Sequence, residues 1–478
     1  MINFKKYGKC CLSLFLAVSM ILMPSVQTFA EEETAAATTD STQTEGEDRE
    51  TQRQKCYAIA PDSNSVENWP QGPATYADSA IVMDMNSGAV LYSKQIEKKH
   101  YPASITKLLT TLVALDNAEL TDTVEFSQDS ISFLEYGDAH IGMTPGEQIS
   151  MEDALYAVLL ASANEVSYAV AESVGKKMGG GYDTFIQAMN DESEKLGCTG
   201  SHWTNANGLH DEQHYTTAHD MARIGAAVYQ KEAFRTISQS LSHTIPVTNL
   251  VNEERTFQQK HKMLWPQNDN YYEYCKGGKT GYTDQARTTL VTMADNGDMQ
   301  LVAVVLYDFG NDAYIDTRAM FDYAYSNFSK ISLKDQKLPE GVKSYEDEDA
   351  YIVLPKSAQF SDVKAEVKED SNKDGSGTVT FTYKGQEVGS VKAAIEKTEE
   401  SSAAVLGKKK DKTTSTVVTG ISKFMKIVIG VVIAVVILLI IIVVLVNCRK
   451  QMRRRRRKKG KRRNAKSSNV KRKKRRRR

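Results

Sequence analysis

Cysteine is scarce in this sequence of 478 residues, which contains six. Three of them lie near the chain ends, within or beside apolar stretches, and the other three are Cys56, Cys198 and Cys275. An odd number in an exported segment fits one disulfide with a free thiol, or three unpaired thiols. The count does not support a fold built on a disulfide framework.

Charge is absent from residues 427–446, and acidic residues are absent after them. Twenty apolar residues at about 1.5 Å rise span a hydrocarbon core of roughly 30 Å, which predicts a transmembrane helix. Residues 449–478 contain 21 Lys and Arg, leaving 40 basic and 60 acidic residues elsewhere. The positive-inside rule therefore places the tail, residues 447–478, in the cytoplasm. Anionic lipids are its expected partner, with nucleic acid or an acidic protein as alternatives.

The N-terminus has the features of a signal peptide over residues 1–30. Three lysines within the first nine residues precede the apolar stretch 10–23, and small residues end at Ala30. The alternative is an uncleaved anchor. In both cases residues 31–426 lie on the external side of the membrane. With the signal peptide cleaved we expect a single-pass membrane protein with an external body, whereas an uncleaved anchor would place both termini inside.

Aliphatic residues are rare in residues 31–75, which predicts a disordered spacer. The segment 397–426, rich in Ser, Thr and Lys, is predicted to be a linker to the membrane. Between them, residues 76–328 and 340–396 have the composition of folded domains.

The first of these domains begins and ends with predicted β-hairpins. Residues 79–85 and 89–92 flank Asn-Ser-Gly, and residues 288–294 and 300–307 flank Asp-Asn-Gly-Asp. Helical periodicity dominates the region between them. The pattern predicts a sheet whose strands come from both ends of the domain, with a helical region inserted. Residues 340–396 are β-rich and predict a small separate β domain.

Ser104 and Lys107 form the first chemical motif, S-x-x-K, at the start of a predicted helix. The i to i+3 spacing places the hydroxyl and the amine on one helical face. A serine becomes a nucleophile when a base removes its proton, and a neutral lysine can be that base. Burial and a neighbouring cation would lower the lysine pKa toward that state.

Two further motifs follow in order along the chain. Ser162-Ala-Asn164 comes 58 residues after Ser104, and Lys279-Thr280-Gly281 comes 117 residues after Ser162. Their order, spacing and predicted positions match the motif set of penicillin-binding proteins and class A β-lactamases.

The sequence then resembles one family, the low-molecular-weight D-alanyl-D-alanine carboxypeptidases. The resemblance rests on residues 101–107 (YPASITK), 204–211 (TNANGLHD) and 279–286 (KTGYTDQA). It implies an α/β fold of the β-lactamase/transpeptidase type, followed by a small β-sandwich domain. It also implies a bacterial cell-wall enzyme acting on stem peptides that end in D-Ala-D-Ala, with β-lactams as covalent inhibitors and no cofactor.

The resemblance also implies a role for each motif residue. Ser104 would be the acylated nucleophile, Lys107 its base, and Ser162 the proton relay to the leaving D-alanine. The substrate would be bound by residues of the other motifs and of a later helix: Asn164, Lys279, Thr280, Gly281, Tyr282 and Arg318. Backbone N–H groups of Ser104 and Tyr282 would hold the oxyanion. The equal alternative for Arg318 is a salt bridge on a helix surface.

Two features depart from the family pattern. Arg287 stands where a small residue is expected, and a spanning helix replaces the usual amphipathic anchor. His210, Asp211, His214 and His219 lack the H-E-x-x-H arrangement, and the family uses no metal, so none is predicted.

Other functions remain open on this fold. A class A β-lactamase would need a glutamate in an E-x-x-L-N stretch between the second and third motifs, and none is present. A transpeptidase differs in the acyl acceptor alone. A non-catalytic β-lactam sensor would be expected to carry a folded signalling module after the membrane helix.

Overall fold

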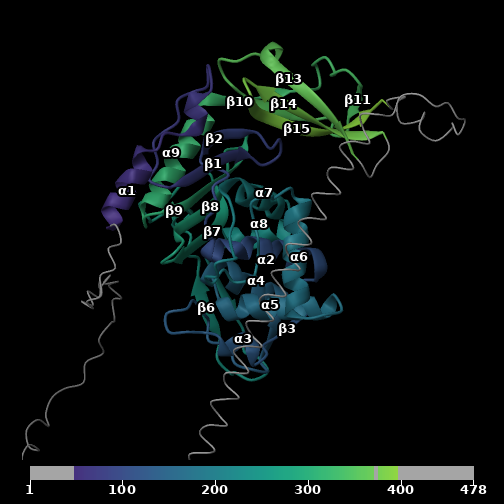
Figure 1. Ribbon diagram of the computed structural model, residues 1–478. Helices are drawn as coiled ribbons and strands as arrows, with labels where there is room; N and C mark the ends of the chain where they lie inside the picture. The colour runs from purple at the N-terminus through teal and green to yellow at the C-terminus, as the bar shows by residue number, and fades with distance from the viewer. Residues whose placement is uncertain (1–47, 371–374, 397–478) are drawn as a thin grey trace, which may run out of the picture. The chain divides into compact units, whose positions relative to one another are not determined.

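A five-stranded antiparallel sheet forms the centre of the computed structural model, which describes residues 48–370 and 375–396 (Figure 1). Its order is β2-β1-β9-β8-β7. The strands are β1 (Ser79–Asp84), β2 (Val90–Lys94), β7 (Cys275–Thr283), β8 (Arg287–Asp295) and β9 (Gln300–Asp308). Both predicted hairpins and the meeting of strands from the two ends of the domain are confirmed.

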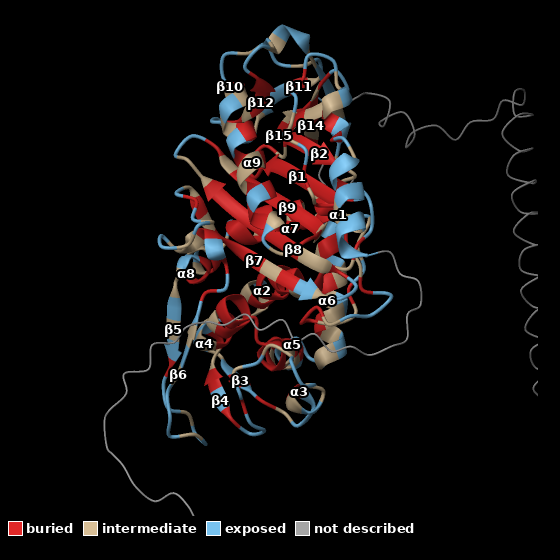
Figure 2. Cartoon of the chain, turned by 90° about the vertical axis from the view of Figure 1, so that its left-hand side faces the viewer, coloured by how far each residue is buried: buried red, intermediate tan, exposed pale blue. Residues whose placement is uncertain are grey.

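The two faces of this sheet pack against different helices. Alternate strand residues point to opposite faces, so Val291 and Val304 join a core with α2, α5 and α7, whereas Leu290 and Val305 join one with α9. Figure 2 shows the central strands as buried on both sides.

The inserted region is helical, as predicted. Its helices are α2 (Lys107–Asn117), α3 (Asp129–Ser132), α4 (Met151–Tyr156), α5 (Asn164–Lys177), α6 (Tyr182–Lys195), α7 (Ala218–Tyr229) and α8 (Glu232–Gln239). The region also contains two antiparallel two-stranded sheets: β3 (Thr123–Glu125) with β4 (Gln148–Ser150), and β5 (Ser242–Ile245) with β6 (Arg255–Gln258). Residues 107–114 of α2 are all buried, so this helix is the centre of the layer.

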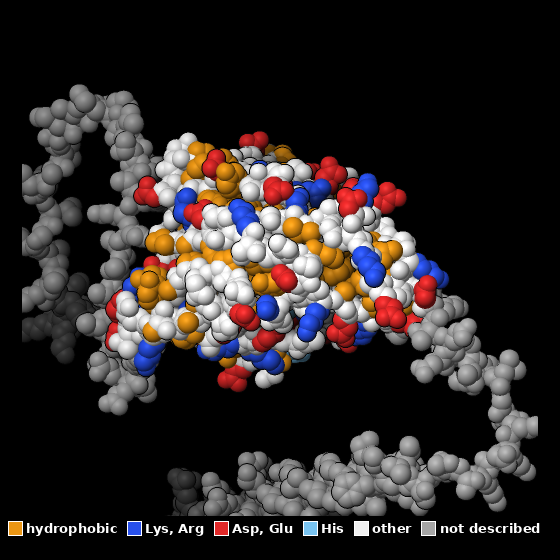
Figure 3. All heavy atoms as spheres, turned by 90° about the horizontal axis from the view of Figure 1, so that it is seen from above, with side chains coloured by type: hydrophobic (Ala, Val, Ile, Leu, Met, Phe, Trp, Pro, Cys, Tyr) orange, Lys and Arg blue, Asp and Glu red, His pale blue; other side chains and the backbone are white. Residues whose placement is uncertain are grey.

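A second sheet forms in residues 340–396. Its strands are β11 (Val342–Tyr345), β13 (Val363–Glu369), β14 (Ser376–Tyr383) and β15 (Gln386–Ile395), in the order β11-β15-β14-β13. Strands β10 (Phe328–Ser332) and β12 (Tyr351–Pro355) pair beside it. Its core residue Phe381 belongs to the same apolar cluster as Trp69, so this sheet shares a core with the first domain. In Figure 3 acidic and basic side chains are interspersed on the visible face.

The predicted disordered spacer is wrong for residues 48–75. Helix α1 (Arg49–Ala58) begins at Asp48, whose carboxylate caps it, and Arg53 pairs with Asp312 at 2.5 Å. Asp312 opens α9 (Asp312–Asn327), which covers the outer face of the sheet. Trp69 is buried and donates to the Leu91 carbonyl at 3.1 Å. Long-range contacts, rather than a local apolar pattern, hold this segment.

The predicted signal peptide, linker, transmembrane helix and basic tail lie outside the described residues. Within the part that the structure describes, no helix combines the length and apolar character that membrane crossing requires.

Candidate active site

A sharp turn at Ala103 places Ser104 at the start of the central helix. Ala103 has a φ of +50°, and the 3-10 turn Ala103–Thr106 runs directly into α2. A positive φ is costly for a non-glycine residue and persists where surrounding contacts impose it. Here the Thr106 hydroxyl donates to the Ala103 carbonyl at 2.9 Å, and the Thr289 hydroxyl donates to the Pro102 carbonyl at 2.8 Å.

Lys107 is fully buried and directs its ammonium at the nucleophile. Its Nζ lies 3.1 Å from Ser104 Oγ, 2.8 Å from Asn164 Oδ1 and 2.5 Å from the Asn207 carbonyl. Burial, assisted by the positive charge of Lys260, lowers the pKa of Lys107 to about 7. Near neutral pH a large fraction of Lys107 is therefore the free amine that can accept the Ser104 proton.

Ser162 and Lys279 form a second hydroxyl–amine pair. Ser162 ends the π-helical turn Ala157–Ala161 in a left-handed conformation, with a φ of +62°. Lys279 Nζ donates to Ser162 Oγ and to the Thr280 carbonyl, both at 2.9 Å. Burial, together with the charges of Lys107 and Lys260, holds the pKa of Lys279 well below its usual range.

The K-T-G strand, β7, touches the nucleophile turn at Gly281. A Cβ on Gly281 would lie 2.8 Å from the Ser104 backbone nitrogen and would also clash with Thr289. Only glycine allows β7 to approach the Ser104 backbone nitrogen this closely. Because β7 is the edge strand, its outer side is not used by the sheet. Thr280 is half-buried and Tyr282 is exposed on this strand.

The loop 204–211 supplies a contact that the sequence did not predict. Gly208 has a φ of +82°, and a Cβ there would overlap the Ala103 carbonyl. The tight turn presents the Asn207 carbonyl to Lys107. The Asn-Gly pair signals a turn, but nothing in the sequence shows that the Asn207 carbonyl accepts a hydrogen bond from Lys107.

Arg318 lies away from the other predicted site residues. It lies on α9, donates to the Tyr271 carbonyl and packs 5.4 Å from the Tyr272 ring. Its predicted substrate contact is therefore not supported, because α9 covers the opposite face of the sheet from α2 and α5. Arg287, the unexpected residue after the K-T-G strand, reaches Gln52 of α1 at 3.4 Å.

The histidines near the site have structural roles. His214 is buried between the Thr106 hydroxyl, at 2.8 Å, and the Thr204 N–H, at 3.0 Å. Burial lowers the pKa of His214 to about 3, so it is neutral. Among the described residues, no three His, Cys, Asp or Glu side chains are placed to hold a metal ion. Cys56, Cys198 and Cys275 are buried free thiols, so the disulfide alternative is wrong.

A serine hydroxyl beside a buried lysine, a second serine–lysine pair and an edge strand define a penicillin-binding type of serine peptidase site. A family model described as D-alanyl-D-alanine carboxypeptidase matches residues 66–310, just over half of the chain. The chain therefore belongs to this family of serine peptidases, and the resemblance seen in the sequence is confirmed.

The chain is also similar to individual relatives and to a solved structure. The chain is 28% identical over 340 residues to the D-alanyl-D-alanine carboxypeptidase DacF of Bacillus subtilis, covering 66% of this chain and 80% of DacF. It is 31% identical over 265 residues to DacC of Escherichia coli, covering 52% and 61%. A solved D-alanyl-D-alanine carboxypeptidase from Mycobacterium tuberculosis is 31% identical, with a TM-score of 0.48 over 56% of this chain and 96% of that one.

Proposed function

We propose that this serine carboxypeptidase removes the terminal D-alanine from peptidoglycan stem peptides through an acyl-enzyme on Ser104. The observation that carries the assignment is the buried Lys107 amine, 3.1 Å from Ser104 Oγ and with a pKa of about 7. A lysine in this state serves as a base at neutral pH, and a surface lysine does not.

In the acylation step, Lys107 accepts the Ser104 proton as Oγ attacks the carbonyl carbon of the penultimate D-alanine. The backbone N–H groups of Ser104 and Tyr282 hold the oxyanion, and each such donor contributes about 3–4 kcal/mol. When the intermediate collapses, the C–N bond breaks, and the proton held by Lys107 is passed through the Ser162 hydroxyl to the leaving nitrogen, so that Lys107 returns to the free amine and Ser162 keeps its proton. Lys279, in contact with Ser162 Oγ, stabilises the charge that passes through this relay.

Substrate binding uses the groups that remain exposed around this centre. Asn164 Oδ1 accepts from Lys107, which leaves its amide N–H₂ to donate to the peptide carbonyl. Thr280 lies on the edge strand, next to Gly281, where its hydroxyl would bind the terminal carboxylate. The peptide would lie along β7 as an added strand.

Deacylation completes the cycle with water as the acceptor. Water gives a proton to Lys107 and its oxygen attacks the ester carbonyl, which releases the shortened peptide and restores the Ser104 hydroxyl. A β-lactam would acylate Ser104 by the same attack. The amine that ring opening releases stays attached to the acyl group and does not leave the site as D-alanine does. The β-lactam therefore inhibits the enzyme.

We further propose that residues 427–446 anchor the enzyme in the bacterial membrane, with the catalytic body outside. The 21 basic residues of 449–478 would then face anionic lipid headgroups in the cytoplasmic leaflet. Each Lys or Arg near such a surface contributes about 1 kcal/mol. Residues 340–396, as a β-sandwich domain of the family type, would stand between the site and the linker 397–426.

Product analysis of the full chain in detergent tests the reaction type. The enzyme is incubated with a peptide ending in D-Ala-D-Ala, with and without glycine as a competing acceptor. Free D-alanine and the shortened peptide are expected in both cases. A glycine-extended peptide as the main product would identify a transpeptidase instead, and rapid turnover of penicillin without D-alanine release would identify a β-lactamase.

A further inference from the structure

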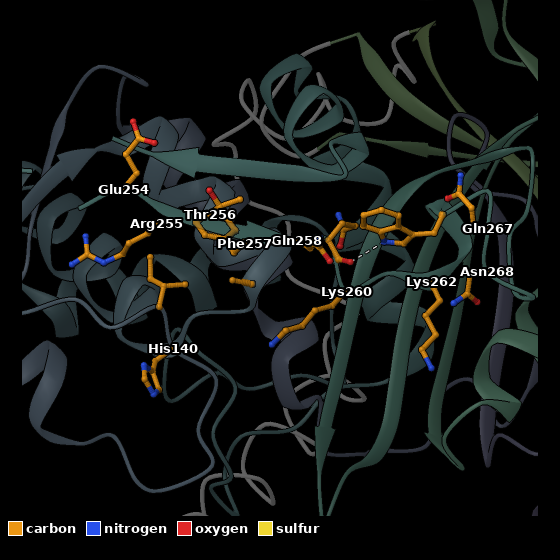
Figure 4. A pocket seen from close by; sticks show the side chains of 14 residues that line it. His140, Glu254, Arg255, Thr256, Phe257, Gln258, Lys260, Lys262, Gln267 and Asn268 are labelled. Carbon is orange, nitrogen blue, oxygen red and sulfur yellow. Dashed lines mark hydrogen bonds between the residues drawn. The ribbon is translucent and has the colours of Figure 1, made fainter. Parts of the chain in front are cut away.

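A large groove opens between two segments of the inserted region. It has a volume of about 1120 Å³, which is at the upper end for small-molecule sites. One wall is formed by residues 140–141 and Ala161, and the other by residues 254–268 (Figure 4). The lining combines apolar and polar side chains, and Thr256, Gln258 and Gln259 offer groups that can hydrogen-bond a peptide backbone.

The groove is joined directly to the catalytic residues. Ala161 in its wall immediately precedes Ser162. The loop that carries His140 is fixed to the second motif, since Asn164 donates its N–H to the Ala139 carbonyl at 2.8 Å. Ile141, which follows His140, donates its backbone N–H to the carboxylate of the buried Glu165 at 2.7 Å. The wall and the motif therefore keep a fixed relation to each other.

Three basic side chains line the groove, and each of them is held differently. Arg255 is paired with Glu147, which lies outside the groove lining, at 2.7 and 3.0 Å, and it also donates to the Gly142 carbonyl at 3.3 Å. Lys262 lies 5.9 Å from the Tyr314 ring. Lys260 makes no hydrogen bond or ion pair with any residue that the structure describes. His140 adds an exposed imidazole from the opposite wall. In Figure 4 the side chains of His140 and Lys260 both extend toward the lower part of the view.

Lys260 also lies close enough to the catalytic centre to act on it. Its positive charge is among the causes that lower the pKa of Lys107 and of Lys279. Partial desolvation lowers the pKa of Lys260 itself. Three lysines gathered at one site, the outermost unpaired, create a positive potential that an incoming anion would relieve. The lining acid, Glu254, lies just before β6, six residues from Lys260 in the sequence.

We propose that this groove is the subsite for the acyl side of the stem peptide, and that Lys260 and His140 bind a free carboxylate on the residue preceding D-Ala-D-Ala. The inference rests on the proposed function, because the peptide must reach the groove from Ser104. The enzyme then selects stems whose third residue bears an unmodified carboxylate, and amidation of that group weakens binding.

Two matched peptides test the subsite. One is acetyl-2-aminoadipyl-D-Ala-D-Ala, with a free side-chain carboxylate, and the other carries the same side chain as a carboxamide. The wild-type enzyme is expected to favour the carboxylate about tenfold in kcat/KM, mostly through KM, since the contact exists in both the bound and the reacting peptide. High salt should reduce this preference, because the pair is partly exposed.

Lys260→Gln should reduce the preference to within about twofold, while Lys262→Gln, which removes the same charge from the same segment, should preserve it. The ratio of the two peptides isolates the contact from any change in the pKa of Lys107, which affects both peptides equally. Penicillin labelling confirms that each variant is folded.

Several outcomes would overturn the inference. One is equal cleavage of both peptides by the wild type, and another is an equal loss of preference in the two variants, which would show a diffuse field. Failure of the wild type to cleave either peptide would instead refute the proposed function, and the subsite with it.

Discussion

Gly281 lies where strand β7 meets the Ser104 backbone, so a single added methyl group tests how the oxyanion site is built. In Gly281→Ala the new Cβ would lie 2.8 Å from the Ser104 nitrogen, against 3.4 Å for ordinary contact. The strand or the turn must therefore shift by about 0.6 Å. Oxyanion donors work within a narrow range of about 2.7–3.1 Å, so this shift effectively removes one donor.

The loss of one donor predicts an acylation rate about one hundredfold lower, while overpacking costs about 1–3 kcal/mol of stability. Stopped-flow acylation by a fluorescent penicillin measures the rate, and thermal unfolding measures the stability. Gly181→Ala is the matched control, because a Cβ there meets no atom within 4 Å. It should acylate at the wild-type rate.

The reasoning is refuted if folded Gly281→Ala acylates as fast as the wild type. The final labelling stoichiometry gives the unfolded fraction of Gly281→Ala. If that fraction alone explains the slower rate, the expected loss of an oxyanion donor is also refuted.

Three further predictions concern charged residues. The kcat/KM of the wild type should rise as the pH increases through about 7, because deprotonation converts Lys107 into the base; a profile that is flat from about pH 6 to 8 would contradict this role. Arg53→Ala removes the ion pair with Asp312 and should lower the Tm by about 2–4 °C, whereas an unchanged melting curve would mean that α1 does not stabilise the body. Arg318→Gln should leave KM within about twofold, since this guanidinium binds the Tyr271 carbonyl; a tenfold rise in KM would return Arg318 to the site.

The sequence predicted the parts of the fold that depend on local patterns. Strand-like runs around Asn-Ser-Gly and Asp-Asn-Gly-Asp identified both hairpins, and the i to i+3 spacing placed Lys107 one turn from Ser104. The three motifs identified the family, and the family resemblance then predicted that Ser162 and Lys279 lie at one site.

Other features depend on contacts between distant segments and leave no local signal. Helix α1 has one buried residue, Cys56, and is held by Arg53 across 259 positions, so its polar composition resembled a disordered spacer. The Asn207 carbonyl acts through backbone geometry, which composition does not encode. The substrate role of Arg318 rests on the resemblance alone and stays a prediction, since its contacts are with Tyr271 and Tyr272.

The central claim is that Ser104 forms the covalent intermediate. Labelling the full chain with a fluorescent penicillin, followed by proteolysis and mass spectrometry, locates the acyl group directly. The account predicts one label per chain on the peptide that contains Ser104, and neither label nor D-alanine release in Ser104→Ala. A label on another residue, or D-alanine release by Ser104→Ala, would contradict the account.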